Sequence, residues 1–441
     1  MCDSTSDIIS HVPGNILDKI LMCLSLKDAV RTSILSRKWR YAWAKLPQLE
    51  FDSTLYYDDS TLYNDDSTLY NDDSKATHTK LMMIIYQVML LHRGPIMKFT
   101  LNVYGLESCS EIDLLILFVS SNDIQDFFLR ITHGELYKLP SSLYSCLQLR
   151  HLRLHSCMLK PPPEFEGFTR LISLDLFHVV IADDVLSSLI SNCPLLEDLT
   201  FLSFTSLHSL EVVGPNLKSV RCYGHFRSIC FTNTSRLATV KICLNKRRRD
   251  LFFSEEETSN SVMLLENVPV IESLELDYCY VKGIAASGVP TRLPTTLNNL
   301  KDITLNYICF GERDEVSVLI CLIRSSPNLE KITINAFPCA TSAIPIDLDF
   351  SEVLGCSDVS LNQLRKVIMT NVSGTKPELE FIKFLLAKSP MLDEMLICLE
   401  SESVADELWI VKELTRLRRA SPQAEMNVSG IIYDDSSLVD A

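Results

Sequence analysis

The chain has no long hydrophobic run. Its longest apolar stretches, residues 81–91 and 112–119, contain polar residues and fall short of the ~18 consecutive apolar residues that a membrane-spanning helix requires. The first seven residues are acidic and lack the basic and apolar regions of a secretion signal. We therefore expect a cytoplasmic or nuclear protein that has no membrane partner.

Positive charge is scarce as well. The 441 residues include 41 Lys and Arg against 56 Asp and Glu, which gives a net charge of -15. Because a nucleic-acid-binding face must neutralise phosphates, we expect no nucleic-acid partner. One dense basic cluster, Lys246, Arg247, Arg248 and Arg249, precedes three glutamates at 255–257. It is interpreted as an exposed loop, with a nuclear-localisation signal as the alternative.

Motifs for catalysis or metal binding are missing. The sequence contains no C-x-x-C pair, P-loop, G-x-S-x-G or H-E-x-x-H. The nearest approach to a ligand cluster, Cys222, His225 and Cys230, has no fourth ligand at a zinc spacing. Most of the 15 cysteines lie in apolar runs, so we expect buried, reduced thiols. We predict no catalytic residue, no metal and no cofactor.

A low-complexity insert is the most acidic part of the chain. Residues 52–72 repeat the heptad D-S-T-L-Y-[YN]-D three times, and residues 50–74 hold eight carboxylates and no Lys or Arg. Such a composition buries too little apolar surface to offset its ordering entropy. We interpret residues 52–74 as a solvated loop, with an acidic docking or phosphorylation segment as the alternative.

One apolar pattern fills most of the remaining chain. An apolar residue, a second three positions later and a third two after that recur fourteen times between residues 46 and 397. This L-x-x-L-x-L spacing is typical of leucine-rich repeats, in which the last two residues lie on a short strand and face the core. The triplets begin at Leu46, Ile96, Ile124, Leu149, Leu171, Leu196, Leu207, Leu217, Leu237, Ile271, Leu300, Leu329, Leu364 and Leu392.

Helices are expected between some of these strands. Apolar runs at 185–193, 316–326 and 381–389 each end at a proline that precedes a triplet, and proline stops a helix. We therefore predict an α/β fold with parallel strands inside and helices outside. The long intervals 237–271 and 329–364 predict inserted loops, and the short ones within 196–217 predict turns without helices. Residues 412–419 are expected to form a charged helix, and residues 420–441 a frayed tail.

The N-terminal segment has more apolar side chains than a module of its size can bury. Apolar residues recur at helical spacing from residue 16 to 24 and again from 29 to 35, and Trp39 and Trp43 lie one turn apart. Three small helices cannot bury all of these side chains, so part of the surface should face a partner. The first triplet follows at once, so this head and the repeats are expected to move as one body.

Two segments carry a family resemblance. The pattern V-P-x-x-I-L-x-x-I-L-x-x-L-x-x-x-D-A-V-R-x-S-x-L-S-R-K-W-R-x-x-W over residues 12–43 resembles an F-box, the module that binds Skp1 in cullin-based ubiquitin ligases. Residues 361–399 resemble the FBD segment that ends many plant F-box/LRR-repeat proteins. The chain thus resembles the plant F-box/FBD/LRR-repeat family. That resemblance implies a tail (1–7), a three-helix F-box (8–47), an irregular leucine-rich-repeat solenoid (48–360), FBD-like terminal repeats (361–420) and a C-terminal tail (421–441).

The resemblance also implies a function. The chain would be the substrate-recognition subunit of an SCF ubiquitin ligase, with a Skp1-like adaptor and a cullin as partners, a target protein on the solenoid, and catalysis on other subunits. The residues implied for Skp1 are Pro13, Ile16, Leu17, Ile20, Leu21, Leu24, Val30, Leu35, Ser36 and Trp39.

Two alternatives stay open. One is a non-degradative interaction scaffold. The other is a small-molecule receptor, which needs a basic pocket that Arg150, Arg153, Arg221 and Lys241 are too few to predict.

Overall fold

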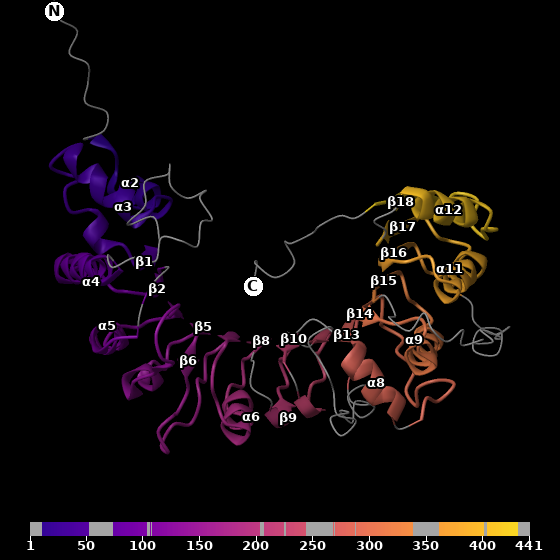
Figure 1. Ribbon diagram of the computed structural model, residues 1–441. Coiled ribbons are helices and arrows are strands. Elements are labelled where there is room, and N and C mark those ends of the chain that lie inside the picture. Colours follow the sequence, from indigo (N-terminus) through magenta and orange to yellow (C-terminus); the bar gives the residue numbers. More distant parts are fainter. Residues whose placement is uncertain are drawn as a thin grey trace, which may run out of the picture. The chain divides into compact units, whose positions relative to one another are not determined.

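The computed structural model describes residues 11–52, 74–103, 106, 108–202, 207–224, 226–243, 268, 270–286, 288–337, 361–400 and 404–430. Several predictions fall outside these residues: the structure of the acidic heptads, the basic cluster 246–249, the ligand role of His225 and the two long inserted loops. The chain divides into two compact units, Met1–Leu202 and Ser203–Ala441. Figure 1 shows the elements of each.

Residues 12–47 of the head contain two short α-helices and two 3₁₀ turns. These are α2 (Gly14–Met22), α3 (Leu26–Arg31), η1 (Thr32–Ile34) and η2 (Trp43–Lys45). The Pro13 carbonyl accepts the first backbone bonds of α2, and the Ser25 hydroxyl caps α3 by accepting from the Asp28 amide at 3.2 Å. The segment between α3 and β1 holds the two 3₁₀ turns.

Parallel strands form the centre of the first unit. They are hydrogen-bonded in the order β1-β2-β3-β5-β7-β8 and pair in step, so that Leu49 lies beside Phe99, and Phe99 beside Phe127. The strands are β1 (Gln48–Asp52), β2 (Lys98–Asn102), β3 (Asp126–Arg130), β5 (His151–His155), β7 (Ser173–Phe177) and β8 (Asp198–Leu202). On one side of the strands lie α4 (Ser74–Leu91), α5 (Ser110–Ser120), η4 (Ser141–Ser145) and α6 (Asp183–Ser191), as Figure 1 shows.

The second unit repeats this plan. Its main sheet has the order β10-β12-β13-β14-β15-β16-β17-β18, and neighbouring strands in it pair in parallel. The strands are β10 (Ser219–Tyr223), β12 (Thr239–Cys243), β13 (Ser273–Asp277), β14 (Asp302–Ile308), β15 (Lys331–Ala336), β16 (Lys366–Val372), β17 (Glu394–Leu399) and β18 (Glu425–Ser429). The helices are α8 (Tyr278–Ala286), α9 (Arg313–Ser325), α11 (Lys376–Lys388) and α12 (Val404–Thr415). Both units confirm the predicted α/β repeat fold.

The core is a set of apolar rows that cross the strands. The two inward residues of each predicted triplet are buried, and the Phe51, Phe99 and Phe127 rings follow one another at 5.8 Å between centroids. Each fully buried Leu or Phe contributes about 1.5–3 kcal/mol relative to an exposed one. The L-x-x-L-x-L pattern predicts this fold well because its apolar residues are the side chains that form the core.

The structure corrects three of the predicted elements. The triplet at Leu207 lies on β9 (Leu207–Val213), which pairs with β11 (Phe226–Thr232) in a separate two-stranded sheet. Residues 425–429 form β18 against β17, so the prediction of a frayed tail was wrong for them. The last helix spans Val404–Thr415, earlier than the predicted 412–419.

Hydrogen bonds join the head to the first repeat. The Arg93 amide donates to the Ala44 carbonyl at 2.8 Å, and the Gln48 side chain donates to the Met22 carbonyl at 3.0 Å. Gly94 lies so close to the head that an added Cβ would be 2.6 Å from the Lys45 carbonyl oxygen. These contacts support the expectation that head and first repeat move together. Among the described residues no helix is long and apolar enough to cross a bilayer.

Candidate functional site

The head has a core of its own. Leu17 and Leu21 of α2 are 4% and 0% exposed, and Trp39 and Trp43 are buried as well. Leu17 and Leu21 are four residues apart on one face of α2, as neighbours on a helix surface are. Three of the residues implied for Skp1 (Leu17, Leu21 and Trp39) are therefore buried in the folded head and are not exposed on its surface.

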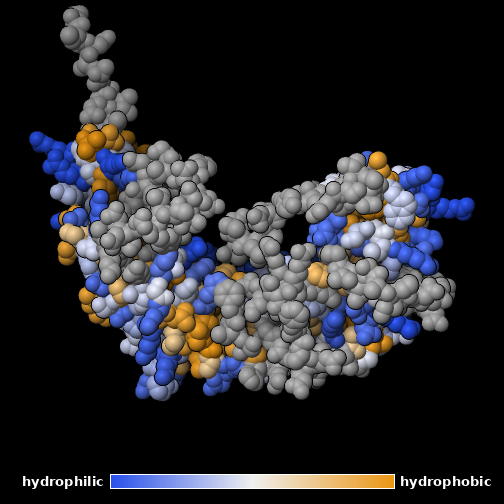
Figure 2. Space-filling view, viewed as in Figure 1, coloured by the Kyte–Doolittle hydropathy of each residue, from blue (hydrophilic) through white to orange (hydrophobic). Residues whose placement is uncertain are grey.

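The head also exposes apolar side chains. Ile16, Ile20 and Leu24 follow each other at four-residue steps, and Ile34 and Leu35 lie at the end of η1 and just after it. Ile34 is 89% exposed. We call these five residues the head surface. Figure 2 shows orange, hydrophobic residues gathered on the head. Isolated exposed apolar residues are normal, whereas five in one small module make the head surface a candidate interaction site.

The other residues implied for Skp1 lie at the margin of this surface. Pro13 is exposed and precedes α2, whereas Val30 and Ser36 are half-buried. The Ser36 hydroxyl oxygen is buried and has no hydrogen-bond partner in the part of the chain that the structure describes. Ile34 was not among the implied residues. The sequence pattern places it at the end of the second apolar run, and in the structure it ends the 3₁₀ turn η1 with its side chain exposed.

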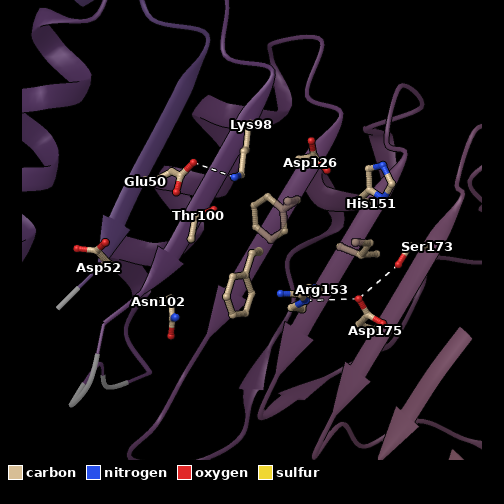
Figure 3. A pocket seen from close by; sticks show the side chains of 13 residues that line it. Glu50, Asp52, Lys98, Thr100, Asn102, Asp126, His151, Arg153, Ser173 and Asp175 are labelled. Carbon is tan, nitrogen blue, oxygen red and sulfur yellow. Dashed lines mark hydrogen bonds and ion pairs between the residues drawn. The ribbon is translucent and has the colours of Figure 1, made fainter. Parts of the chain in front are cut away.

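A second candidate surface lies on the strands of the first unit. The outward-facing residues of β1, β2, β3, β5 and β7 form a polar face, which we call the strand face, and a shallow hollow lies on it (Figure 3). Two ion pairs cross between neighbouring strands: Lys98 with Glu50 at 2.8 Å and Arg153 with Asp175 at 3.4 Å. The strand face therefore carries polar recognition groups on a rigid sheet.

Aromatic rings lie among these charges. The Arg153 guanidinium lies 5.2 Å from the centroid of the Phe128 ring, a cation–π distance. The His155 ring stacks on Phe177 at 4.4 Å and also meets Phe128 at 5.5 Å. Burial, and then the charges of Arg130, His178 and Arg153, lower the pKa of His155 to about 3. His155 is thus a neutral ring packed between two phenylalanines.

The second unit also has a polar strand face. Lys241 pairs with Glu275 at 2.9 Å, and Lys366 pairs with Glu394 at 2.7 Å. The Asn306 amide donates to the same Glu275 carboxylate at 2.9 Å. Of the four scattered cations weighed for a small-molecule pocket, Arg153 and Lys241 therefore each pair with a carboxylate on the adjoining strand.

Two buried thiols illustrate how the core affects cysteine. Burial raises the pKa of Cys222 to about 12, and burial likewise raises the pKa of Cys193 to about 11. A thiol is nucleophilic and binds metals as the thiolate, so these groups are inert near neutral pH. Among the described residues, no three His, Cys, Asp or Glu side chains are grouped closely enough to hold a metal ion.

Two protein families match parts of the chain. Residues 9–50 match the F-box domain, the module known to bind Skp1. Residues 114–334 match the family described as the LRR repeats of FBD-associated F-box protein At5g56370. The first match covers most of the head and the start of β1, and the second covers repeats from both units.

Relatives from Arabidopsis thaliana match along nearly the whole length. F-box/FBD/LRR-repeat protein At1g13570 is 36% identical over 425 residues, which cover 95% of this chain and 98% of the relative. FBD-associated F-box protein At5g56370 is 25% identical over 95% of this chain and 99% of its own length, and F-box/LRR-repeat protein 13 is 24% identical over 96% of both. The chain, with its apolar head surface and its repeated parallel strands, belongs to the F-box/FBD/LRR-repeat protein family.

Proposed function

We propose that this chain is the substrate-recognition subunit of an SCF ubiquitin ligase. The head surface binds a Skp1-like adaptor and, through it, a cullin. The repeats hold a target protein, and ubiquitin transfer takes place on other subunits. The chain then acts by proximity, since it raises the effective concentration of a target lysine near the conjugating enzyme.

The exposed head surface is the observation that carries this proposal. A surface of five large aliphatic residues costs free energy in water, and burying it against a partner would recover about 25 cal/mol for each Å² of apolar area. Helix geometry sets the spacing of Ile16 and Ile20, and the buried Leu17 and Leu21 side chains anchor α2 in the head. A rigid apolar surface loses little entropy on binding, which favours a stable adaptor complex.

Binding of a purified Skp1-like adaptor to the full-length chain tests the proposal. We predict that the double variant Ile16→Asp/Ile34→Asp loses at least about a hundredfold in affinity, because each change places a charge at the centre of the interface at a cost of about 2 kcal/mol or more. Isothermal calorimetry measures the loss, and the melting temperature should stay close to that of the wild type because both side chains are exposed.

Leu147→Asp is the matched control. Leu147 is 56% exposed and lies outside the head, so this variant should bind the adaptor as the wild type does. Equal affinity of the double variant and the wild type would refute the head surface as the adaptor site. A chain that binds the adaptor but leaves the cullin out of the complex would instead support the non-degradative scaffold.

A further inference from the structure

The charges of the strand face largely cancel in pairs. Glu50 neutralises Lys98, and Asp175 neutralises Arg153. Each pair joins residues on neighbouring strands and is at least partly exposed, so it contributes little to stability, about 0–1 kcal/mol. Its main effect is on recognition: a paired cation is less available to a ligand. The charges that remain unpaired therefore decide what the face attracts.

Arg130 is such a charge. It is the last residue of β3, it is exposed, and it makes no ion pair with any residue in the described part of the chain. The parallel register places it directly beside Asn102 of β2 and His155 of β5. The pKa values of His155 and His178 are both lowered, first by burial and then by the positive charge of Arg130.

The surroundings of Arg130 suit an anionic ligand. On the next strand lies His155, whose ring stacks on Phe177. The amide of Asn102 lies on the other side of Arg130. A guanidinium binds carboxylate or phosphate oxygens through two parallel hydrogen bonds, and an adjacent aromatic surface accommodates the apolar part of a side chain.

We propose that the carboxyl ends of β3, β5 and β7 recognise an anionic side chain of the target protein, with Arg130 as the residue that binds its carboxylate or phosphate group. The proposal rests on the proposed function, in which the repeats hold a target, and it names the chemistry of that target. The partner is a peptide segment that carries an aspartate, a glutamate or a phosphorylated residue.

The opposite end of β3 presents the competing possibility. Asp126 begins the strand and makes no ion pair within the described residues. Four residues separate it from Arg130, a distance of about 13 Å along a strand. A target held there would instead carry a lysine or an arginine. Arg130 is exposed whereas Asp126 is half-buried, and the His155 ring that stacks on Phe177 lies on the strand beside Arg130. These features favour the carboxyl end and an anionic ligand.

Peptide libraries test whether the strand face prefers an anionic or a cationic side chain. The full-length chain, purified with its adaptor, is offered four degenerate peptide libraries whose central residue is fixed as phosphoserine, glutamate, alanine or lysine. We expect retention of the phosphoserine library, the glutamate library or both over the alanine library, and their ratio tells a phosphate from a carboxylate. For the best peptide, Arg130→Ala should weaken binding by about tenfold or more in fluorescence anisotropy, and Arg130→Lys should weaken it less.

Arg170→Ala is the control, because Arg170 is an exposed arginine of the same unit that lies in the turn before β7, away from the outward-facing rows of the strand face. It should bind the selected peptide as the wild type does. The proposal is overturned if the lysine library is preferred, if no library is retained, or if Arg130→Ala binds as tightly as the wild type. Adaptor capture in the same samples reports on the head separately, so a failure here is distinct from a failure of the proposed function.

Discussion

His155 shows how the repeat scaffold shapes single residues. Its ring lies between Phe128 and Phe177, and both burial and neighbouring cations oppose its protonation. With a pKa of about 3 in the folded chain against an ordinary value of 6.5, the folded chain binds this proton less readily than the unfolded chain. The stabilising effect of His155 is therefore complete above pH 6.5 and is lost progressively as the pH falls toward 3.

We predict that the His155 ring stays neutral between pH 8 and pH 5. Proton and carbon NMR of histidine-labelled protein should show no titration of its signals over that range, whereas the same residue in the urea-unfolded chain titrates near 6.5. Acidification from pH 7 to pH 5 should also destabilise the wild type more than His155→Gln, because only the wild type carries this linkage. A titration midpoint above pH 6 in the folded chain would contradict the packing described for this ring.

Single-residue exposure was only partly predictable. The helical spacing of the head identifies Ile16, Leu17, Ile20 and Leu21 as apolar, but it does not say which pair faces inward. That choice depends on where Trp39 and Trp43 pack, which is a tertiary contact. Arg130 and His155 are 25 positions apart, but each directly follows the last residue of its triplet, so their pairing follows from the parallel register of the repeats.

At the scale of elements, close backbone contact fixes the head on the first repeat. Gly94 lies in the segment between α4 and β2, and its small size lets this segment approach the Lys45 carbonyl. In the second unit, a capping box at the start of α11 has a similar fixing role: the Thr375 amide donates to the Glu378 carboxylate at 2.7 Å. Local contacts of this kind set the position of each helix against its strand.

Gly94→Ala is predicted to loosen the junction. The new methyl group would meet backbone atoms that cannot rotate away, and such overpacking costs roughly 1–3 kcal/mol. Thermal unfolding followed by tryptophan fluorescence suits the measurement, because two of the three tryptophans, Trp39 and Trp43, lie in the head. Gly14→Ala is the matched control, since nothing lies within 4 Å of its added Cβ. A Gly94→Ala variant as stable as this control would contradict the tight junction.

The sequence predicted the strands better than their partners. Thirteen of the fourteen triplets lie on strands of the main sheets. They could be predicted because the apolar spacing that identifies a triplet also places its last two side chains in the core. The triplet at Leu207 has the same spacing but pairs with β11 outside the main sheet, a choice that depends on turn geometry. Strand β18 was missed because Gln423, three positions before Met426, is not apolar.

At the scale of the whole molecule, the proposed adaptor site and the proposed target site are separate surfaces. The head surface is apolar and suits a permanent partner, whereas the strand face of the first unit is polar and suits an exchangeable one. Both belong to the unit Met1–Leu202, and the hydrogen bonds around Ala44 and Gln48 connect the head to the strands. A target bound on the strands would therefore be held at a defined position relative to the adaptor.

Hydrogen–deuterium exchange of the full-length chain, measured with and without a Skp1-like adaptor, tests this division most directly. Binding should slow amide exchange in residues 14–36, which carry the head surface, and leave exchange in residues 126–177 of the strand face unchanged. Protection of residues 126–177 by the adaptor, or a complex that forms without protection of residues 14–36, would contradict the account.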